Sequence, residues 1–446
     1  MYLPPISEVF QAHPRSMIGG SIHPLARTNF ILDSSGVAGV LGGEEAIASI
    51  TLVHVFEGRK WLGWYNSPGS YVIGMRFGRL ARSAVPASSL HGRGGVRTDL
   101  ATLFEYDGRK GPRFRAVHSG TALDETGHLA ALLMCECVEL EGEKVKGRET
   151  RPIGVTIADL SSFTEKETYS LKWSQPLAPL YASVPILISL LTCAASGWYR
   201  DWYSFSMILL GIIASGVSSH VIGSGNFTFT HPEPALGSPP GDGILSSEDG
   251  VVLLSGSESA INAVTRGRFS LTFESRHASR SIRWCSVFLV TQAIAQLIVI
   301  PQGSLFGQLM FVSSVAVSWA YNLWLGSFDK EKVHRDILMD ILGKPKLTKF
   351  ILGTRTSMVV FVLLVLHLRD PEEIMNVLLP HHTPVWLTWK TTIIDRFKHR
   401  RELEFGPHDW DDPAFSSSDR DLLRTLFKDA EDAYRGFKSH YDNPKA

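Results

Sequence analysis

The chain has 446 residues but only four cysteines, and this scarcity excludes a fold held together by disulfides. Cys135 and Cys137 form a lone Cys-x-Cys, and Cys193 and Cys285 lie in apolar runs. None of these spacings is that of a zinc ribbon or finger. We therefore expect buried structural thiols, a reducing compartment and no bound metal.

An excess of charge of either sign is also missing. The 44 basic residues (Lys and Arg) balance the 44 acidic residues (Asp and Glu), so the basic excess of a nucleic-acid-binding protein is absent and no nucleic-acid partner is expected. The first residues carry neither a basic start nor an apolar run of signal-peptide length. Any membrane insertion must therefore come from internal segments.

Signatures of common enzymes are missing as well: the sequence contains no GxxxxGK[ST], no HExxH and no GxSxG. Residues 409–412 (DWDD) match the DxDD acid motif of some terpene cyclases, and His381 precedes His382. We interpret both as polar turns, and the glycine-rich residues 36–43 as a flexible loop. The sequence therefore predicts no cofactor.

Charge is missing locally in two long apolar blocks. Residues 174–223 carry only Arg200 and Asp201, and residues 284–328 carry no Asp, Glu, Lys or Arg. Each block holds two helices of about 20 residues, enough to cross about 30 Å of hydrocarbon. Soluble helices rarely run so far without a charge on any face. The sequence predicts an α-helical integral membrane protein with four transmembrane helices, as hairpins over residues 173–223 and 284–328.

A fifth apolar run, residues 356–368, is only 13 residues long between Arg355 and Arg369. This length is short for a crossing, and it suits a buried core element or an interfacial segment. We favour an element that does not span. If the run did span, the C-terminal region would lie on the opposite side.

Basic residues near the span ends gather on the side of the N-terminus, at Lys166, Lys172, Arg276, Arg280, Arg283, Lys330, Lys332 and Arg335. The other side offers only Arg200. The positive-inside rule then predicts that both termini and the central loop are cytosolic. The glycosylation sequon at Asn226 begins three residues after a predicted span end, and we interpret it as chance.

Three predicted soluble parts complete the chain. Residues 1–172 are expected to form a mixed α/β domain, with strands at 50–56, 71–77 and 153–160 and a helix, or a helix running into a strand, at 123–140. Residues 224–283 are expected to hold a Gly/Pro/Ser-rich linker (223–250) and a short helix capped by Ser255. Residues 329–446 are expected to be mostly helical, with helices at 329–342, 371–379, 386–397 and 419–434. The last of these helices is expected to face inward with Leu422, Leu423, Leu426, Phe427 and Ala430.

The helix at 386–397 pairs an apolar face with a basic one, which consists of Lys390, Arg396, Lys398, Arg400 and Arg401. Such a helix could lie on anionic lipid, but we favour a helix packed on its domain. Inside the spans, the polar residues are His220, Gln292, Gln296, Gln308 and Asn322. They either line a polar passage or join helices by hydrogen bonds, and we favour the second. Gly211, Ser215 and Ser219 form a small-residue face suited to a homo-oligomer contact.

Residues 353–361 (GTRTSMVVF), preceded by residues 329–338 (DKEKVHRDIL), resemble a stretch of fungal multi-pass membrane proteins without assigned activity. The resemblance implies a membrane location and carries over no catalytic residue. The leading hypothesis is a membrane-anchored structural or adaptor module in the lipid bilayer. The alternatives are an oligomeric transporter or channel subunit and a membrane-bound enzyme acting on a lipophilic substrate.

Overall fold

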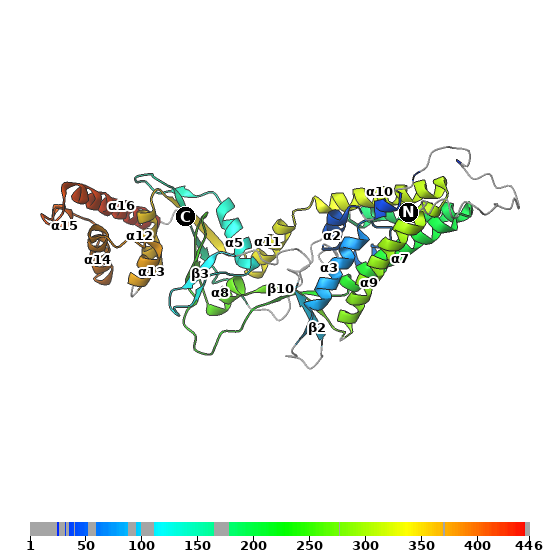
Figure 1. Ribbon diagram of the computed structural model, residues 1–446. Helices are drawn as coiled ribbons and strands as arrows, with labels where there is room; N and C mark the ends of the chain where they lie inside the picture. The colour runs from blue at the N-terminus through cyan, green and yellow to red at the C-terminus, as the bar shows by residue number, and fades with distance from the viewer. Residues whose placement is uncertain are drawn as a thin grey trace, which may run out of the picture. The chain divides into compact units, whose positions relative to one another are not determined.

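The computed structural model of the chain describes residues 25, 32, 35–39, 41–51, 59–87, 95–99, 111–164, 178–275, 277–368 and 371–441. The chain forms two compact units, each assembled from three separate stretches (Figure 1). The bundle unit takes residues 1–98, 172–226 and 272–328, and the sheet unit takes residues 99–171, 227–271 and 329–446. The predicted N-terminal domain, residues 1–172, is thus shared between the two units.

Four long apolar helices dominate the bundle unit: α6 (Ala178–Trp198), α7 (Trp202–Gly223), α9 (Ala278–Val299) and α10 (Leu305–Gly326). Arg200, with a φ of 60°, lies in the turn between α6 and α7, and a 3₁₀ turn, η3 (Ile300–Gln302), connects α9 to α10. All four are long and apolar enough to cross a membrane, which confirms that part of the prediction. α9 begins six residues before the predicted block and includes Arg280 and Arg283.

The bundle unit also contains shorter helical elements that the sequence did not predict: η1 (Ser35–Gly39), α2 (Gly43–Thr51), η2 (Arg59–Trp61) and α3 (Ser70–Arg82). The strand predicted at 71–77 is wrong, because these residues belong to α3. Ile73 and Phe77 are four residues apart, and Leu80 follows three residues later, so all three lie on one face of a helix. All three are buried. Of the strand predicted at 50–56, residues 50–51 lie in α2, and residues 52–56 are outside the described residues.

A seven-stranded sheet, in the order β4-β3-β8-β9-β6-β11-β5, forms the centre of the sheet unit. Its strands are β3 (Arg113–Ala116), β4 (Ala122–Leu123), β5 (Glu143–Lys144), β6 (Ile153–Asp159), β8 (Gly243–Ser246), β9 (Gly250–Ser255) and β11 (Lys346–Leu352). β6 confirms the strand predicted at 153–160. It pairs in parallel with β9 and antiparallel with β11, so Val155 lies opposite both Val251 and Phe350. Three stretches far apart in sequence therefore build one sheet.

Helices complete the sheet unit: α5 (His128–Glu139), α8 (Glu258–Thr265), α11 (Lys330–Ile341), α12 (Arg355–Leu366), α13 (Glu372–Leu378), α14 (Pro384–Lys398), α15 (Pro407–Trp410) and α16 (Ser417–Tyr441). One hydrophobic cluster joins Val155 and Phe350 of the sheet to Phe361 of α12 and Phe427 of α16. Residues 356–364 of α12 are all buried, which supports the interpretation of the fifth apolar run as a core element.

Several local predictions need correction. The predicted linker at 223–250 contains both β7 (Asn226–Thr230) and β8, and the predicted helical C-terminal region supplies β11. The helix cap is Ser257, whose hydroxyl accepts from the Ala260 N–H, because Ser255 is the last residue of β9. Leu422 of α16, predicted to face inward, is 40% exposed. The remaining strands are β1 (Val85–Ala87), β2 (Gly95–Asp99) and β10 (Arg268–Phe273).

Candidate functional sites

Asn66 forms the hub of a polar cluster inside the bundle unit. It is fully buried, its backbone N–H donates to Ser189 Oγ of α6 at 3.0 Å, and its Nδ2 donates to Ser314 Oγ of α10 at 2.8 Å. Gln296 Nε2 of α9 donates to Asn66 Oδ1 at 3.3 Å. We call these four residues the polar centre. Asn66 was not among the predicted candidates, because residues 59–69 carry no long apolar run.

Two of the predicted intramembrane residues belong to this network. Gln296 also donates to the Met207 carbonyl of α7 at 3.2 Å, and it accepts from Gln292 Nε2 at 3.3 Å. The polar centre thus contacts all four long helices. Gln292 is 1% exposed, and its Oε1 has no hydrogen-bond partner among the described residues. Buried amides joined in this way favour helix packing over a passage.

The structure places the other predicted residues elsewhere. Asn322 of α10 accepts from the Tyr65 hydroxyl at 2.9 Å and donates to Ser67 Oγ at 3.2 Å. Gln308 donates to the carbonyls of Pro301 and Gly303, both at 3.2 Å, and thereby closes the turn before α10. His220, near the end of α7, packs its ring on Trp61, with centroids 4.6 Å apart. In the part of the chain that the structure describes, neither Gln308 nor His220 forms a hydrogen bond to the polar centre.

The small-residue face of α7 is covered within the chain. A Cβ on Gly211 would collide with the side chain of Asn66. In the same way, a Cβ on Gly63 would collide with the side chain of Ser219. Ser215 and Ser219 are both buried. Close approach of backbones at small residues is the usual result of such a pattern. Here the approaching backbone belongs to residues 59–69, and the homo-oligomer contact stays a prediction.

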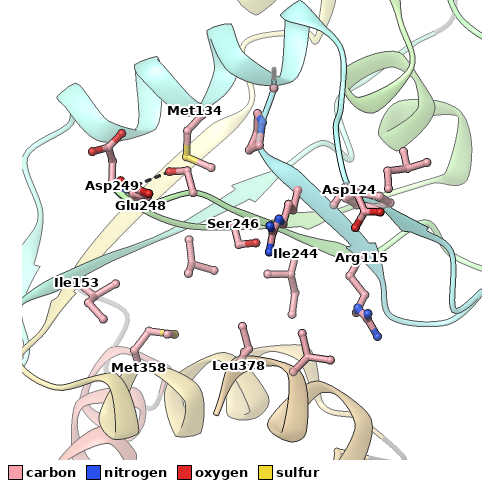
Figure 2. Close-up of a pocket in the computed structure, with 18 of the residues that line it drawn as sticks. Arg115, Asp124, Met134, Ile153, Ile244, Ser246, Glu248, Asp249, Met358 and Leu378 are labelled. Atoms are coloured by element: carbon pink, nitrogen blue, oxygen red, sulfur yellow. Dashed lines mark hydrogen bonds between the residues drawn. The ribbon is translucent and has the colours of Figure 1, made fainter. Parts of the chain in front are cut away.

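The sheet unit contains a cavity of about 1210 Å³ between strands and helices (Figure 2). One wall is the sheet face at Ile153, Ile244 and Ser246, and the opposite wall is formed by Met358 of α12 and Leu378 of α13. Drug-sized ligand sites are typically about 300–1,000 Å³ and mostly apolar, with a few polar groups. At about 1210 Å³ this cavity is somewhat larger than that range, and it has the apolar walls of a ligand site.

Charged side chains also line the cavity, and they are Arg113, Arg115, Asp124, Glu125, Glu248, Asp249, Arg151 and Arg355. Arg115 of β3 forms an ion pair with Glu373 of α13 at 2.7 Å, which joins the two walls. Arg151 and Arg355 form no ion pair with the part of the chain that the structure describes. Both lie beside Gly353, whose carbonyl accepts from the Arg151 backbone N–H at 3.2 Å.

The other residues singled out in the sequence have structural partners. Asp409 binds Arg396 at 3.3 Å and Asp411 binds Arg420 at 2.7 Å, so the DxDD-like acids are engaged in ion pairs. On the basic face of α14, Lys390 is buried and donates to the Leu379 carbonyl at 2.6 Å, which agrees with a packed helix. Within the described residues, no group of three His, Cys, Asp or Glu side chains could hold a metal ion.

No protein-family model, no curated protein and no solved structure matches the chain. The resemblance of residues 329–361 to fungal membrane proteins stays a prediction. The polar centre and the cavity are the two features of the chain that bear on its function.

Proposed function

We propose that the protein is a membrane-anchored adaptor whose cytosolic sheet unit binds an amphipathic ligand in the cavity. The main support for this proposal is the cavity, which has apolar walls at Ile244, Met358 and Leu378 and charged side chains in its lining. The four apolar helices support the anchoring role, since each is long enough to span a bilayer.

A ligand with an apolar chain and an anionic head group fits this lining best. The apolar chain of the ligand would lie between Ile244 and Met358, where its apolar surface is removed from water. The head group would meet Arg151 and Arg355, which lack an acidic partner in the described structure and can bind a carboxylate or phosphate through two N–H groups each.

The two alternatives have weaker support. A transporter needs polar groups along a passage, whereas Gln296 and Asn322 are already hydrogen-bonded to neighbouring segments of the same chain. An enzyme needs a reactive constellation, and Asp409 and Asp411, the best acidic candidates in the sequence, are held in ion pairs.

Photolabelling tests the proposed function on the full chain in membranes. A fatty acid bearing a diazirine should give adducts on cavity peptides around Ile244 and Met358. The variant Ser246→Phe, which fills the cavity, should remove these adducts, whereas Val138→Phe, at an exposed position of α5, should leave them. Labelling confined to the long helices, or unchanged by Ser246→Phe, would overturn the proposal.

The sign of the head group is tested by comparing the fatty acid with the corresponding fatty alcohol. Arg151→Gln and Arg355→Gln together should lower cavity labelling by the acid about tenfold and leave labelling by the alcohol unchanged. Equal losses for both probes would show that the two arginines do not select an anionic head group.

A further inference from the structure

Residues 61–69 run along α7 from its C-terminal end toward its middle. Successive contacts pair Trp61 with His220, Gly63 with Ser219, Trp64 with Gly216, and Asn66 with Gly211. The nine residues from 220 to 211 correspond to about 14 Å along a helix. Asn66 therefore lies near the middle of α7, and its hydrogen bonds to Ser189 and Ser314 place it near the middle of α6 and α10 as well.

The helix α3 then returns along α9, beside which Figure 1 draws it. Its contacts pair Gly74 with Val290, Gly78 with Ser286, and Ala81 with Ser279. Ser286 Oγ donates to the Gly74 carbonyl at 2.6 Å, and Ser279 Oγ donates to the Ala81 carbonyl at 3.3 Å. The helix α3 thus runs from the middle of α9 back to the first residues of α9.

Residues 61–69 start, and the helix α3 ends, at the same end of the bundle. Gln296, near the end of α9, donates to the carbonyl of Met207, near the start of α7, so the two helices are antiparallel. The His220 end of α7 and the Ser279 end of α9 therefore coincide. We propose that residues 61–82, the inserted segment, form a re-entrant membrane hairpin that turns at mid-depth and leaves on the side where it entered.

The exposed side of α3 changes character along its length in the way a half-crossing requires. Tyr71 and Met75, near the tip, are 44% and 48% exposed, whereas the exposed residues near the end are Arg79 and Arg82. Apolar side chains suit hydrocarbon, and arginines suit the interface, where they reach the head groups.

The tip satisfies the main constraint on irregular backbone at membrane depth, which is tolerated where protein surrounds it. Gly63 and residues 65–70 are all buried. Asn66 supplies hydrogen bonds to three helices, and Gly69, with a φ of 73°, makes the turn into α3. The one charge midway along α3, Arg76, is buried in protein and does not face lipid.

Labelling of single cysteines with a membrane-impermeant maleimide in sealed vesicles tests the inserted segment. The background is Cys135→Ser, which removes the exposed thiol and keeps the three buried ones. Lys60→Cys and Arg82→Cys should react from the same side. Tyr71→Cys and Met75→Cys should react at least tenfold more slowly from either side, because hydrocarbon excludes the reagent.

Matched controls are Val138→Cys and Leu422→Cys, whose native side chains are 41% and 40% exposed in the sheet unit. They should react at the rate of an ordinary exposed thiol. Reaction of Tyr71→Cys and Met75→Cys at that same rate would place α3 in water and overturn the proposal. Reaction of Lys60→Cys and Arg82→Cys from opposite sides would show a full crossing and overturn it as well. Both tip variants lie at exposed positions, so neither removes a core contact.

Discussion

Asp201, in the turn between α6 and α7, accepts hydrogen bonds from both the backbone N–H and the hydroxyl of Ser304 at the start of α10, at 2.7 and 2.6 Å. Asp201 is 4% exposed and also caps α7 by accepting from the Ser204 N–H at 3.2 Å. One carboxylate therefore joins the turns of the two long hairpins.

Replacing Asp201 should destabilise the bundle more than loss of an ordinary helix cap. Asp201→Ala removes the cap and two charge-assisted bonds to Ser304, and we expect a loss of about 2–4 kcal/mol in unfolding free energy. Asp329→Ala, which removes only the cap of α11, should cost about 1 kcal/mol. Unfolding of both variants in detergent measures the difference, and equal losses would show that the bonds between the hairpins contribute nothing.

The two buried glutamines of α9 should respond differently to replacement by methionine. Gln296→Met removes bonds to Asn66, Met207 and Gln292, and at about 0.6 kcal/mol per intramembrane bond the expected cost is about 2 kcal/mol. Gln292→Met removes one bond but also an Oε1 without a described partner, so its effect should stay within about 0.5 kcal/mol. A larger loss for Gln292→Met than for Gln296→Met would contradict the hydrogen-bond pattern of the polar centre.

The long apolar helices could be predicted because their signal is local: about twenty residues without charge have few other folds. The inserted segment could not, because a half-crossing needs only a short apolar stretch, and α3 carries Arg76, Arg79 and Arg82. One signal was available. Gly74 and Gly78 have the four-residue spacing of close helix contact, and both lie against Ser286 of α9.

The sheet was harder to predict for a different reason. β6 has a clear strand pattern, but its partners β9 and β11 lie about 100 and 190 residues further along the chain, and pairing at such distances leaves no local trace. The cavity depends on that pairing, since Ile153, Ile244 and Met358 meet only in the assembled unit. None of its lining residues could therefore be chosen from the sequence.

Stability should decline in alkaline solution because of Cys137. Burial, with a contribution from the charge of Glu136, raises the pKa of its thiol from 9.0 to about 12. The unfolded chain releases this proton from about pH 9, whereas the folded chain keeps it up to about pH 12. The contribution of the thiol to the free energy of unfolding therefore falls by about 1.4 kcal/mol per pH unit between these two values. Cys137→Ala lacks this dependence. Unfolding of both chains between pH 8 and 11 should show a difference that changes with pH, and a constant difference would contradict the shift.

The orientation of the chain is open to a direct test with tags and a surface thiol. The positive-inside rule predicts that the central loop and the C-terminus are cytosolic. A tag inserted after Ser238, beside the fully exposed Leu236, and a tag after Ala446 should both resist external protease on intact cells. Trp198→Cys, at a position 85% exposed near the turn of the first hairpin, should react with an external maleimide. A C-terminal tag on the side of Trp198, with the tag after Ser238 on the cytosolic side, would require an odd number of crossings between the two tags and would contradict α12 as a buried core helix.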